Sequence, residues 1–210
     1  MHGVLILSLK NKRVLLTYGP TWVAIDSVRV LSNVSTGQMG KTLARLLKKE
    51  GARVTALEGP VQAPLKDKGI KIIPFRFFGE LQKILATETQ KNYDIIIHAA
   101  AVSDYRPRHA HAGKLNPDSK KFTIDLIPTP KIINHLKKIC PRVFLVGFKL
   151  GGTATKLFKE ADCDLVVANQ LENKKYSGYI LDRQKNVLAK AHSRAEMAQK
   201  LINVIKQTTI

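Results

Sequence analysis

The feature that most constrains the fold of this chain is a regular alternation of two kinds of segment. Short runs rich in valine, isoleucine and leucine recur without alternating polar residues, which is typical of parallel strands buried on both faces. Segments with the 3.6-residue period of amphipathic helices lie between these runs. The strands are therefore expected at residues 13–17, 53–57, 70–75, 93–101, 142–148 and 163–169.

The helical segments carry their own start and stop signals. Gly51 is placed to end the first helix and Pro130 to open the third. Ser193 and Glu196 form a capping-box pattern at the last helix. Strands and helices in this order predict an α/β protein with a Rossmann-like, doubly wound, mostly parallel sheet. The helices are expected at 39–49, 78–89, 130–139 and 193–206.

Two segments depart from the alternation. Residues 120–127 alternate with period two and predict an antiparallel strand, and residues 178–191 predict a hairpin that turns at 183–186. Since no repeat or linker is visible, the chain is expected to form a single domain over 1–210. Within it, residues 1–12 are interpreted as an N-terminal extension, and residues 108–128 as a flap and antiparallel extension.

The cellular compartment follows from what the chain lacks. The apolar run Val4 to Leu9 is far shorter than the roughly 20 residues of a spanning helix, so it is expected to form an extra strand or a packed tail. Two cysteines, Cys140 and Cys163, match neither a zinc spacing nor a disulfide framework, and both thiols are expected to be buried. These observations favour a cytoplasmic protein with no membrane association.

Charge is the one unusual property of the composition. Thirty-five lysines and arginines against 16 acidic residues give a net charge of +19, which raises the hypothesis of nucleic-acid binding. The basic residues are scattered, however, and no aromatic platform of an RNA-recognition motif is present. Small polyanionic substrates are therefore favoured over nucleic acid as the ligand.

In doubly wound sheets, ligands bind beyond the carboxyl ends of the strands, which directs attention to the loops there. The stretch 32–40, SNVSTGQMG, leads into a helix whose free N–H groups favour an anion. A helix cap with a packing glycine explains the same residues equally well. The loop after Thr17 is also about twenty residues long, a length that usually indicates function.

Two further stretches are candidates for the site. In HAAAVSDYRP, residues 98–107, three alanines at a strand end allow a ligand to approach the backbone, and Asp104 and Arg106 add charge. Lys114 stands in a loop rich in glycine, asparagine and proline, from which it could close over phosphates. Each stretch also has a structural explanation, namely a packed strand end and a solvated lysine.

Several enzyme classes are excluded or disfavoured by their motifs. The phosphate-binding loop pattern fails because no glycine stands at position 35, and the dinucleotide fingerprint is missing. An NAD(P)-dependent oxidoreductase also lacks its Tyr-x-x-x-Lys pair, since Tyr105 is followed four residues later by His109. The histidines and acidic residues show no metal-ligand spacing, and no nucleophile elbow or catalytic-cysteine signature is present.

Taken together, six stretches in order resemble one family. LLTYGPTWVAIDSVRVLSNVSTGQMGKTLARLL, GARVTALEGPV, DIIIHAAAVSDYRP, PTPKII, VGFKL and DLVVAN resemble phosphopantothenate–cysteine ligases of coenzyme A biosynthesis. The resemblance implies that 4'-phosphopantothenate is joined to cysteine through an acyl-nucleotide, at the expense of CTP or ATP with Mg²⁺. It also implies a homodimer built in part through the antiparallel extension, a decarboxylase on a separate chain, and no FMN.

The resemblance also assigns roles to residues. Asn33, at the acyl intermediate, and Lys114, on the flap, would be catalytic, and Asp104 would lie near the nucleotide as a ligand of Mg²⁺. The remaining substrate-binding residues would be Arg29, Ser35, Thr36, Gly37, Ala99, Ala100 and Ala101. The nucleotide-binding residues would be Asp104, Lys114, Pro130, Lys131, Ile132, Phe148, Lys156 and Lys159.

This chain departs from the family pattern at the flap and around the nucleotide. The flap motif, usually Lys-x-Lys-Lys, reads KLNP from Lys114, and the motif segment at 130–132 has lysine at its centre. The helix that carries Lys156 and Lys159 is short. These departures leave open which nucleotide is used, and a basic nucleotide- or RNA-binding domain without catalysis is the alternative interpretation.

Overall fold

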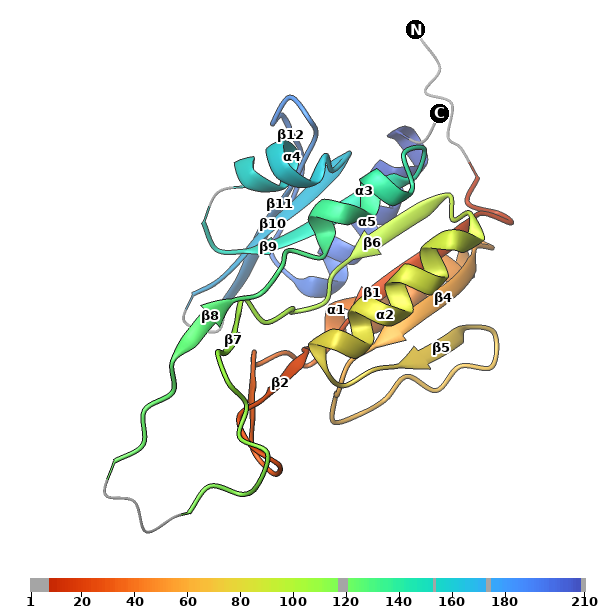
Figure 1. Cartoon of the computed structure of the whole chain (residues 1–210). Helices are drawn as coiled ribbons and strands as arrows, with labels where there is room; N and C mark the ends of the chain where they lie inside the picture. The colour runs from red at the N-terminus through yellow and green to blue at the C-terminus, as the bar shows by residue number, and fades with distance from the viewer. Residues whose placement is uncertain (1–7, 117–120, 153, 173–174, 209–210) are drawn as a thin grey trace, which may run out of the picture.

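The computed structural model describes residues 8–116, 121–152, 154–172 and 175–208. An eight-stranded sheet forms its centre, in the order β12-β11-β10-β9-β6-β1-β4-β5 (Figure 1). Numbered along the chain, its parallel strands run in the order 3-2-1-4-5-6, that of the doubly wound nucleotide-binding fold. The predicted fold class is confirmed. These strands are β1 (Arg13–Tyr18), β4 (Arg53–Glu58), β5 (Lys71–Pro74), β6 (Ile95–His98), β9 (Phe144–Leu150) and β10 (Leu165–Glu172).

An antiparallel hairpin extends the sheet beyond β10. Strand β11 (Lys175–Leu181) pairs with β10, and β12 (Val187–Ala191) pairs with β11 at the edge of the sheet. The turn between them is closed by Asp182, whose carboxylate accepts the Asn186 backbone N–H at 2.7 Å. The hairpin predicted at 178–191 is confirmed.

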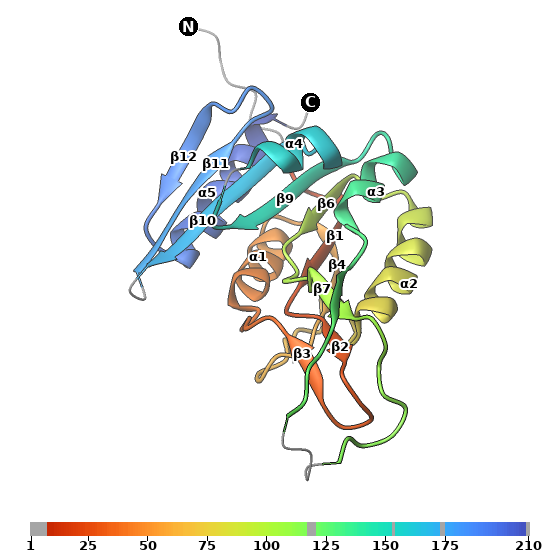
Figure 2. The ribbon, with the colours of Figure 1, turned by 60° about the vertical axis from the view of Figure 1, so that its left-hand side comes forward.

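Helices cover both faces of the sheet (Figure 2). Helices α1 (Gln38–Lys49) and α5 (Arg194–Thr208) pack on one face, and α2 (Phe78–Glu88), α3 (Ile133–Ile139) and α4 (Thr155–Ala161) pack on the other. A short 3₁₀ helix, η1 (Thr89–Lys91), continues α2. The predicted cap of α5 is present, because the Glu196 N–H donates to Ser193 Oγ at 3.1 Å.

A small hairpin that the sequence did not indicate projects beyond the carboxyl end of β1. Strands β2 (Trp22–Ala24) and β3 (Val30–Ser32) pair antiparallel, and the flap runs beside them (Figures 1 and 2). The sequence analysis treated this region as one long loop, because strands of three residues are too short to show a period.

Two predicted boundaries are wrong. Helix α3 begins at Ile133 rather than Pro130, because Thr129, just before it, is tied to the chain after β6 by contacts described below. Residue 120 of the strand expected at 120–127 lies outside the described residues, and within 121–127 only β8 (Leu126–Pro128) forms, paired with β7 (Tyr105–Pro107). Beyond Arg108 and Asp125, which are joined by a backbone hydrogen bond of 2.8 Å, the two arms of the flap separate around a cavity of about 310 Å³.

The N-terminal apolar run and the two cysteines were also the subject of predictions. Residues 4–7 of the apolar run lie outside the described residues, whereas Leu9 is buried in the core. Cys163 is buried as expected, and Cys140 is only half-buried. Throughout the described ranges, every helix is too short or too polar to span a membrane.

Candidate active site

The switch point of the sheet lies between β1 and β6, and there the chain remains paired beyond the ends of both strands. Ala99 N–H donates to the Thr17 carbonyl at 2.9 Å, and Ala101 N–H donates to the Gly19 carbonyl at 2.9 Å. Thr21 N–H in turn donates to the Ala101 carbonyl at 3.3 Å. The alanines predicted to bind substrate therefore form a continuous backbone ledge with the loop after β1.

Three buried hydroxyl residues join this ledge to the segment that precedes α3. The Ser103 N–H donates to Thr21 Oγ1 at 2.9 Å, and Thr129 Oγ1 donates to the Ser103 carbonyl at 2.5 Å. The Thr129 N–H donates to the Asp104 carbonyl at 2.9 Å. Thr21, Ser103 and Thr129 were not predicted from the sequence, because isolated hydroxyl residues carry no periodic signal.

Asn33 lies on the ledge, as its predicted role requires. Its Nδ2 donates to the carbonyls of Ala101 at 3.3 Å and Val102 at 3.1 Å. Both partners can only accept a hydrogen bond, so chemistry fixes the amide with its nitrogen toward them. A ligand on the exposed side of Asn33 therefore meets Oδ1, which is an acceptor. The structure thus brings together two predicted residues that are 68 positions apart in sequence.

The residues at the start of α1 are held by local contacts. The Gly37 N–H donates to Ser35 Oγ at 3.5 Å and the Gln38 N–H to Thr36 Oγ1 at 3.4 Å. Gly37 has a φ of 67°, and a Cβ there would lie 2.8 Å from Val61 Cγ1. The contact with Val61 supports the explanation of Gly37 as a packing glycine. The start of α1 remains a candidate anion-binding site.

Two predicted nucleotide-binding residues meet at the ledge. Lys131 Nζ forms an ion pair with Asp104 Oδ1, and both side chains are exposed. In the described part of the chain, no cluster of three histidine, cysteine or acidic side chains could hold a metal ion. Asp104 is therefore a single carboxylate candidate for Mg²⁺.

The other predicted nucleotide-binding residues lie on α4, on β9 and on either side of Lys131. Lys156 and Lys159 are exposed on α4, and Phe148 is half-buried on β9, opposite Val167 of β10. Pro130 and Ile132 line a cavity of about 310 Å³ between α2 and α3. No hydrogen bond or ion pair within the described residues joins this group to Lys114.

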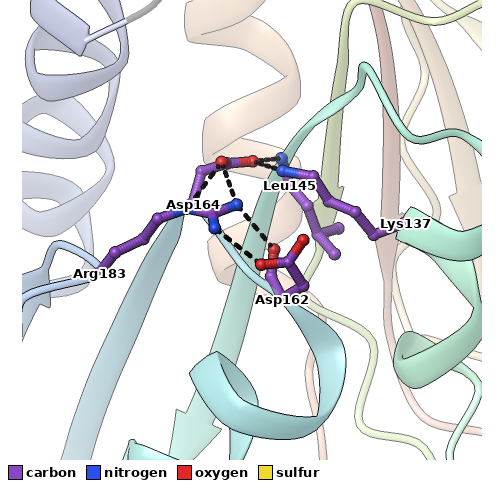
Figure 3. Close-up of polar contacts among 5 residues, drawn as sticks. All are labelled: Lys137, Leu145, Asp162, Asp164 and Arg183. Atoms are coloured by element: carbon purple, nitrogen blue, oxygen red, sulfur yellow. Dashed lines mark hydrogen bonds and ion pairs between the residues drawn. The ribbon is translucent and has the colours of Figure 1, made fainter.

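A partly exposed ion cluster fixes α3 and α4 at the opposite end of the sheet (Figure 3). Asp164, just before β10, accepts the Leu145 N–H at 2.7 Å and pairs with Lys137 of α3 at 2.5 Å. Arg183, between β11 and β12, pairs with Asp164 at 2.8 Å and with Asp162 at the end of α4 at 2.7 Å. The Asp164 carboxylate thereby joins the start of β10 to β9, to α3 and to the β11–β12 turn, and Arg183 adds the end of α4.

Asp26 occupies the turn between β2 and β3, and its side chain is fully buried. Oδ1 accepts the backbone N–H groups of Val28 at 2.9 Å and Arg29 at 2.6 Å. Oδ2 accepts Arg29 Nη1 at 2.6 Å and the N–H of Leu115 in the flap at 3.1 Å. Although burial raises the pKa of Asp26, these N–H groups and the guanidinium outweigh it and hold the pKa at about 2.

The structure therefore places Arg29 and Lys114 on neighbouring segments. Arg29 is tied to Asp26, and Lys114 precedes Leu115 in the flap, where the lysine side chain is exposed. The sequence analysis missed Asp26. The available signal was its position three residues before Arg29, since a short acidic side chain often accepts backbone N–H groups of the following turn.

His98 is buried at the end of β6, where Nδ1 lies 2.9 Å from Thr17 Oγ1. Burial lowers the pKa of His98 from 6.5 to about 4. Below pH 6.5 the unfolded chain therefore binds a proton at this residue that the folded chain rejects. Stability should fall as the pH drops from about 7 to 4, with His98 contributing about 3 kcal/mol.

Urea unfolding at pH 7 and at pH 4.5 tests this prediction. The loss of stability between the two pH values should be clearly smaller in His98→Asn than in the native chain. His109→Asn, which changes an exposed histidine in the flap, should leave the loss unchanged. An equal pH dependence in His98→Asn and the native chain would contradict the assignment.

The strand order and the ledge at the switch point define a doubly wound α/β protein whose site is built without a dinucleotide fingerprint. The chain belongs to the family described as DNA/pantothenate metabolism flavoprotein C-terminal domain, whose sequence profile matches residues 9–209.

Known proteins with similar sequences and structures support this family assignment. The coenzyme A biosynthesis bifunctional protein CoaBC of Thermococcus kodakarensis is 36% identical over 176 residues, which are 79% of this chain and 43% of that protein. The DNA/pantothenate metabolism flavoprotein from Streptococcus pneumoniae superposes with a TM-score of 0.81 at 27% identity, over 93% of this chain and 98% of that one.

A more distant structure shares the fold. A Cab2 variant in complex with phosphopantothenate-cysteine has a TM-score of 0.77 at 18% identity, over 95% of this chain and 88% of that one. The chain spans about half the length of the curated relatives it matches, 43% and 53% of two CoaBC proteins.

Proposed function

We propose that this chain is a phosphopantothenate–cysteine ligase that acts in coenzyme A biosynthesis. The observation that carries the proposal is the contact of Asn33 with the carbonyls of Ala101 and Val102. It joins the two stretches that the resemblance assigns to the acyl substrate. Similarity to CoaBC proteins supports the assignment, as does the phosphopantothenate-cysteine bound by a protein of the same fold.

The proposed reaction has two steps. In the first, the carboxylate of 4'-phosphopantothenate attacks the α-phosphorus of CTP or ATP, and pyrophosphate leaves. In the second, the amine of cysteine attacks the acyl carbon of the acyl-nucleotide, and the nucleoside monophosphate leaves. The ledge at Ala99 to Ala101 holds the pantothenate arm, and Arg29 and the helix start at Ser35 to Gly37 hold its anionic groups.

Each step places a different demand on the residues. Negative charge accumulates on the departing pyrophosphate in the first step, and we assign its stabilisation to Lys114, with Lys156 and Lys159 as further cations. In the second step Asn33 lies at the reacting carbonyl. Because its nitrogen is held by two backbone carbonyls, its Oδ1 is placed to accept an N–H of the incoming cysteine amine.

Mg²⁺ is proposed as the cation that accompanies the nucleotide. A bound Mg²⁺ would neutralise phosphate charge, and it commonly uses one or two protein carboxylates together with substrate phosphates. Asp104 fits this requirement as a single exposed carboxylate beside the ledge. Lys131, paired with Asp104, would then be free to meet a phosphate. Pro130 and Ile132 are proposed to border the nucleotide base, and Phe148, which packs on the other face of the sheet, is proposed as a further nucleotide contact.

The chain is also proposed to act as a homodimer through its flap. Phe122, Ile124 and Leu126 are exposed by 55%, 36% and 41%, respectively. Their spacing of two places them on one side of an extended segment, where a second copy would cover them. Phe122→Asp should halve the mass in solution measured by light scattering. Val187→Asp, at an exposed position on β12, is the control, and a native chain that is already monomeric would contradict the proposal.

Pyrophosphate release tests the ligase proposal. With phosphopantothenate and CTP or ATP but no cysteine, we expect about one pyrophosphate for each site, and added cysteine should make the release continuous. The alternative, a basic nucleotide- or RNA-binding domain, is motivated by the net charge of +19. It predicts affinity for oligonucleotides that falls steeply with salt, together with no release of pyrophosphate.

A further inference from the structure

We infer that Asp26 is a positioning residue that holds the substrate-binding Arg29 and the flap of Lys114 through one shared carboxylate. This inference rests on the proposed function for the roles of Arg29 and Lys114. The contacts of Asp26 itself are independent of that function.

The two oxygens of the Asp26 carboxylate have different partners, and this difference supports the inference. Oδ1 organises the turn alone, by accepting two backbone N–H groups within the β2–β3 hairpin. Oδ2 is shared between Arg29 Nη1, at 2.6 Å, and the Leu115 N–H, at 3.1 Å. Leu115 is 89 residues from Asp26 in sequence. One oxygen atom therefore links the guanidinium to the flap backbone next to Lys114.

Neighbouring contacts show that the flap lies along the turn. The His111 N–H donates to the Ile25 carbonyl at 2.9 Å, and the Ser27 N–H donates to the Gly113 carbonyl at 3.4 Å. The contact of Asp26 with Leu115 lies next to these two. Of the three, it alone involves a side chain, so substitution of Asp26 removes it without changing the backbone.

The chemistry of the contact requires a carboxylate. All four partners of Asp26 are N–H donors, and an ionised carboxylate offers only acceptors. In Asp26→Asn one oxygen becomes an NH₂ group of nearly the same shape, which cannot accept from the two donors that faced it. Since an asparagine oxygen commonly accepts the backbone N–H groups of its own turn, the variant is expected to keep the contacts of the turn and to lose those with Arg29 and the flap.

The first test measures exchange of the Leu115 amide hydrogen by NMR. Asp26→Asn should speed this exchange by about tenfold or more, because the amide loses its acceptor. Asp67→Asn is the matched control: Asp67 also accepts a backbone N–H, from Gly69 at 2.9 Å, and pairs with a cation, Lys48, at 2.6 Å. It should leave Leu115 unchanged. Unchanged exchange of Leu115 in Asp26→Asn would overturn the inference, whether or not the chain is a ligase.

The second test separates positioning from general destabilisation. Asp26→Asn should raise KM for phosphopantothenate through Arg29 and also slow pyrophosphate release through Lys114, each by about tenfold or more. Leu115→Pro, which removes the flap N–H but leaves Arg29 paired with Oδ2, should slow pyrophosphate release while KM for phosphopantothenate stays the same. Equal effects of the two variants on both constants would count against the shared role of Oδ2.

A double-mutant cycle with Lys114→Ala completes the test. If Asp26 acts on the first step through Lys114, Asp26→Asn should slow pyrophosphate release much less in the Lys114→Ala chain than in the native chain. Fully additive effects would overturn the inference. Absence of pyrophosphate release in the native chain would instead refute the proposed function, and the exchange of Leu115 would still decide the role of Asp26.

Discussion

Asn33→Ala is expected to release pyrophosphate from CTP or ATP and then to stall with the acyl-nucleotide accumulated on the protein. The first step does not require Asn33, whereas the second needs the acceptor that its Oδ1 presents to the cysteine amine. Loss of one aimed polar group at a reacting carbonyl typically slows a reaction about 100- to 1,000-fold. We therefore expect a reduction of this size in the rate at which cysteine consumes the intermediate.

Rapid quench with mass spectrometry of the acyl-nucleotide measures this step directly. Asn203→Ala, which changes an exposed asparagine on α5, is the control and should consume the intermediate at the native rate. Prompt formation of the cysteine adduct by Asn33→Ala would remove Asn33 from its proposed role. Failure to release pyrophosphate at all would place its role in the first step instead.

Gly40→Ala is expected to be the most destabilising single substitution proposed for this chain. Gly40 lies in α1 directly over Tyr18 of β1, and a Cβ there would stand 2.2 Å from both Cβ and Cγ of the tyrosine. The Tyr18 side chain cannot move away from the added Cβ, because it is buried and its hydroxyl donates to Glu58 Oε2 at 2.6 Å. The helix would have to move away from the sheet, which we expect to cost about 3 kcal/mol or more of unfolding free energy.

Gly79→Ala is the matched control for this prediction. Gly79 lies in α2, and a Cβ there meets no atom within 4 Å. Alanine should stabilise the chain by about 0.5 to 1 kcal/mol, since it restricts the unfolded state and favours the helix. Denaturant unfolding of the two variants should therefore shift in opposite directions. A Gly40→Ala variant as stable as the native chain would show that α1 is not held against Tyr18.

The regular part of the fold could be predicted because its signal is periodic. Continuous β-branched runs identified all six parallel strands, and capping residues located α5. The β2–β3 hairpin could not be predicted, because its strands are three residues long and are stabilised by contacts with the flap and the ledge. The start of α3 was misplaced for a related reason: Pro130 suits a helix start locally, but Thr129 before it is tied to Ser103 and Asp104, which are distant in sequence.

Loop position and composition alone indicated three stretches as candidates for the site, and the resemblance then assigned roles to single residues. Asn33 and the alanines at 99–101 do meet, although nothing in their local sequence requires it. Gly37 and Gly40 were interpreted as part of an anion loop, and the structure shows that both also admit close packing against Tyr18. Asp26 was not found, because three of the four groups that its carboxylate accepts are backbone N–H groups and one of them lies 89 residues away. Such contacts depend on the folded arrangement of distant segments.

The most direct test of the central proposal is to identify the product of a complete reaction by mass spectrometry. The folded chain is incubated with 4'-phosphopantothenate, cysteine, Mg²⁺ and either CTP or ATP. We predict phosphopantothenoylcysteine, with one nucleoside monophosphate and one pyrophosphate formed for each molecule of product. The absence of this product with both nucleotides, from protein shown to be folded, would contradict the assignment of this chain as a phosphopantothenate–cysteine ligase.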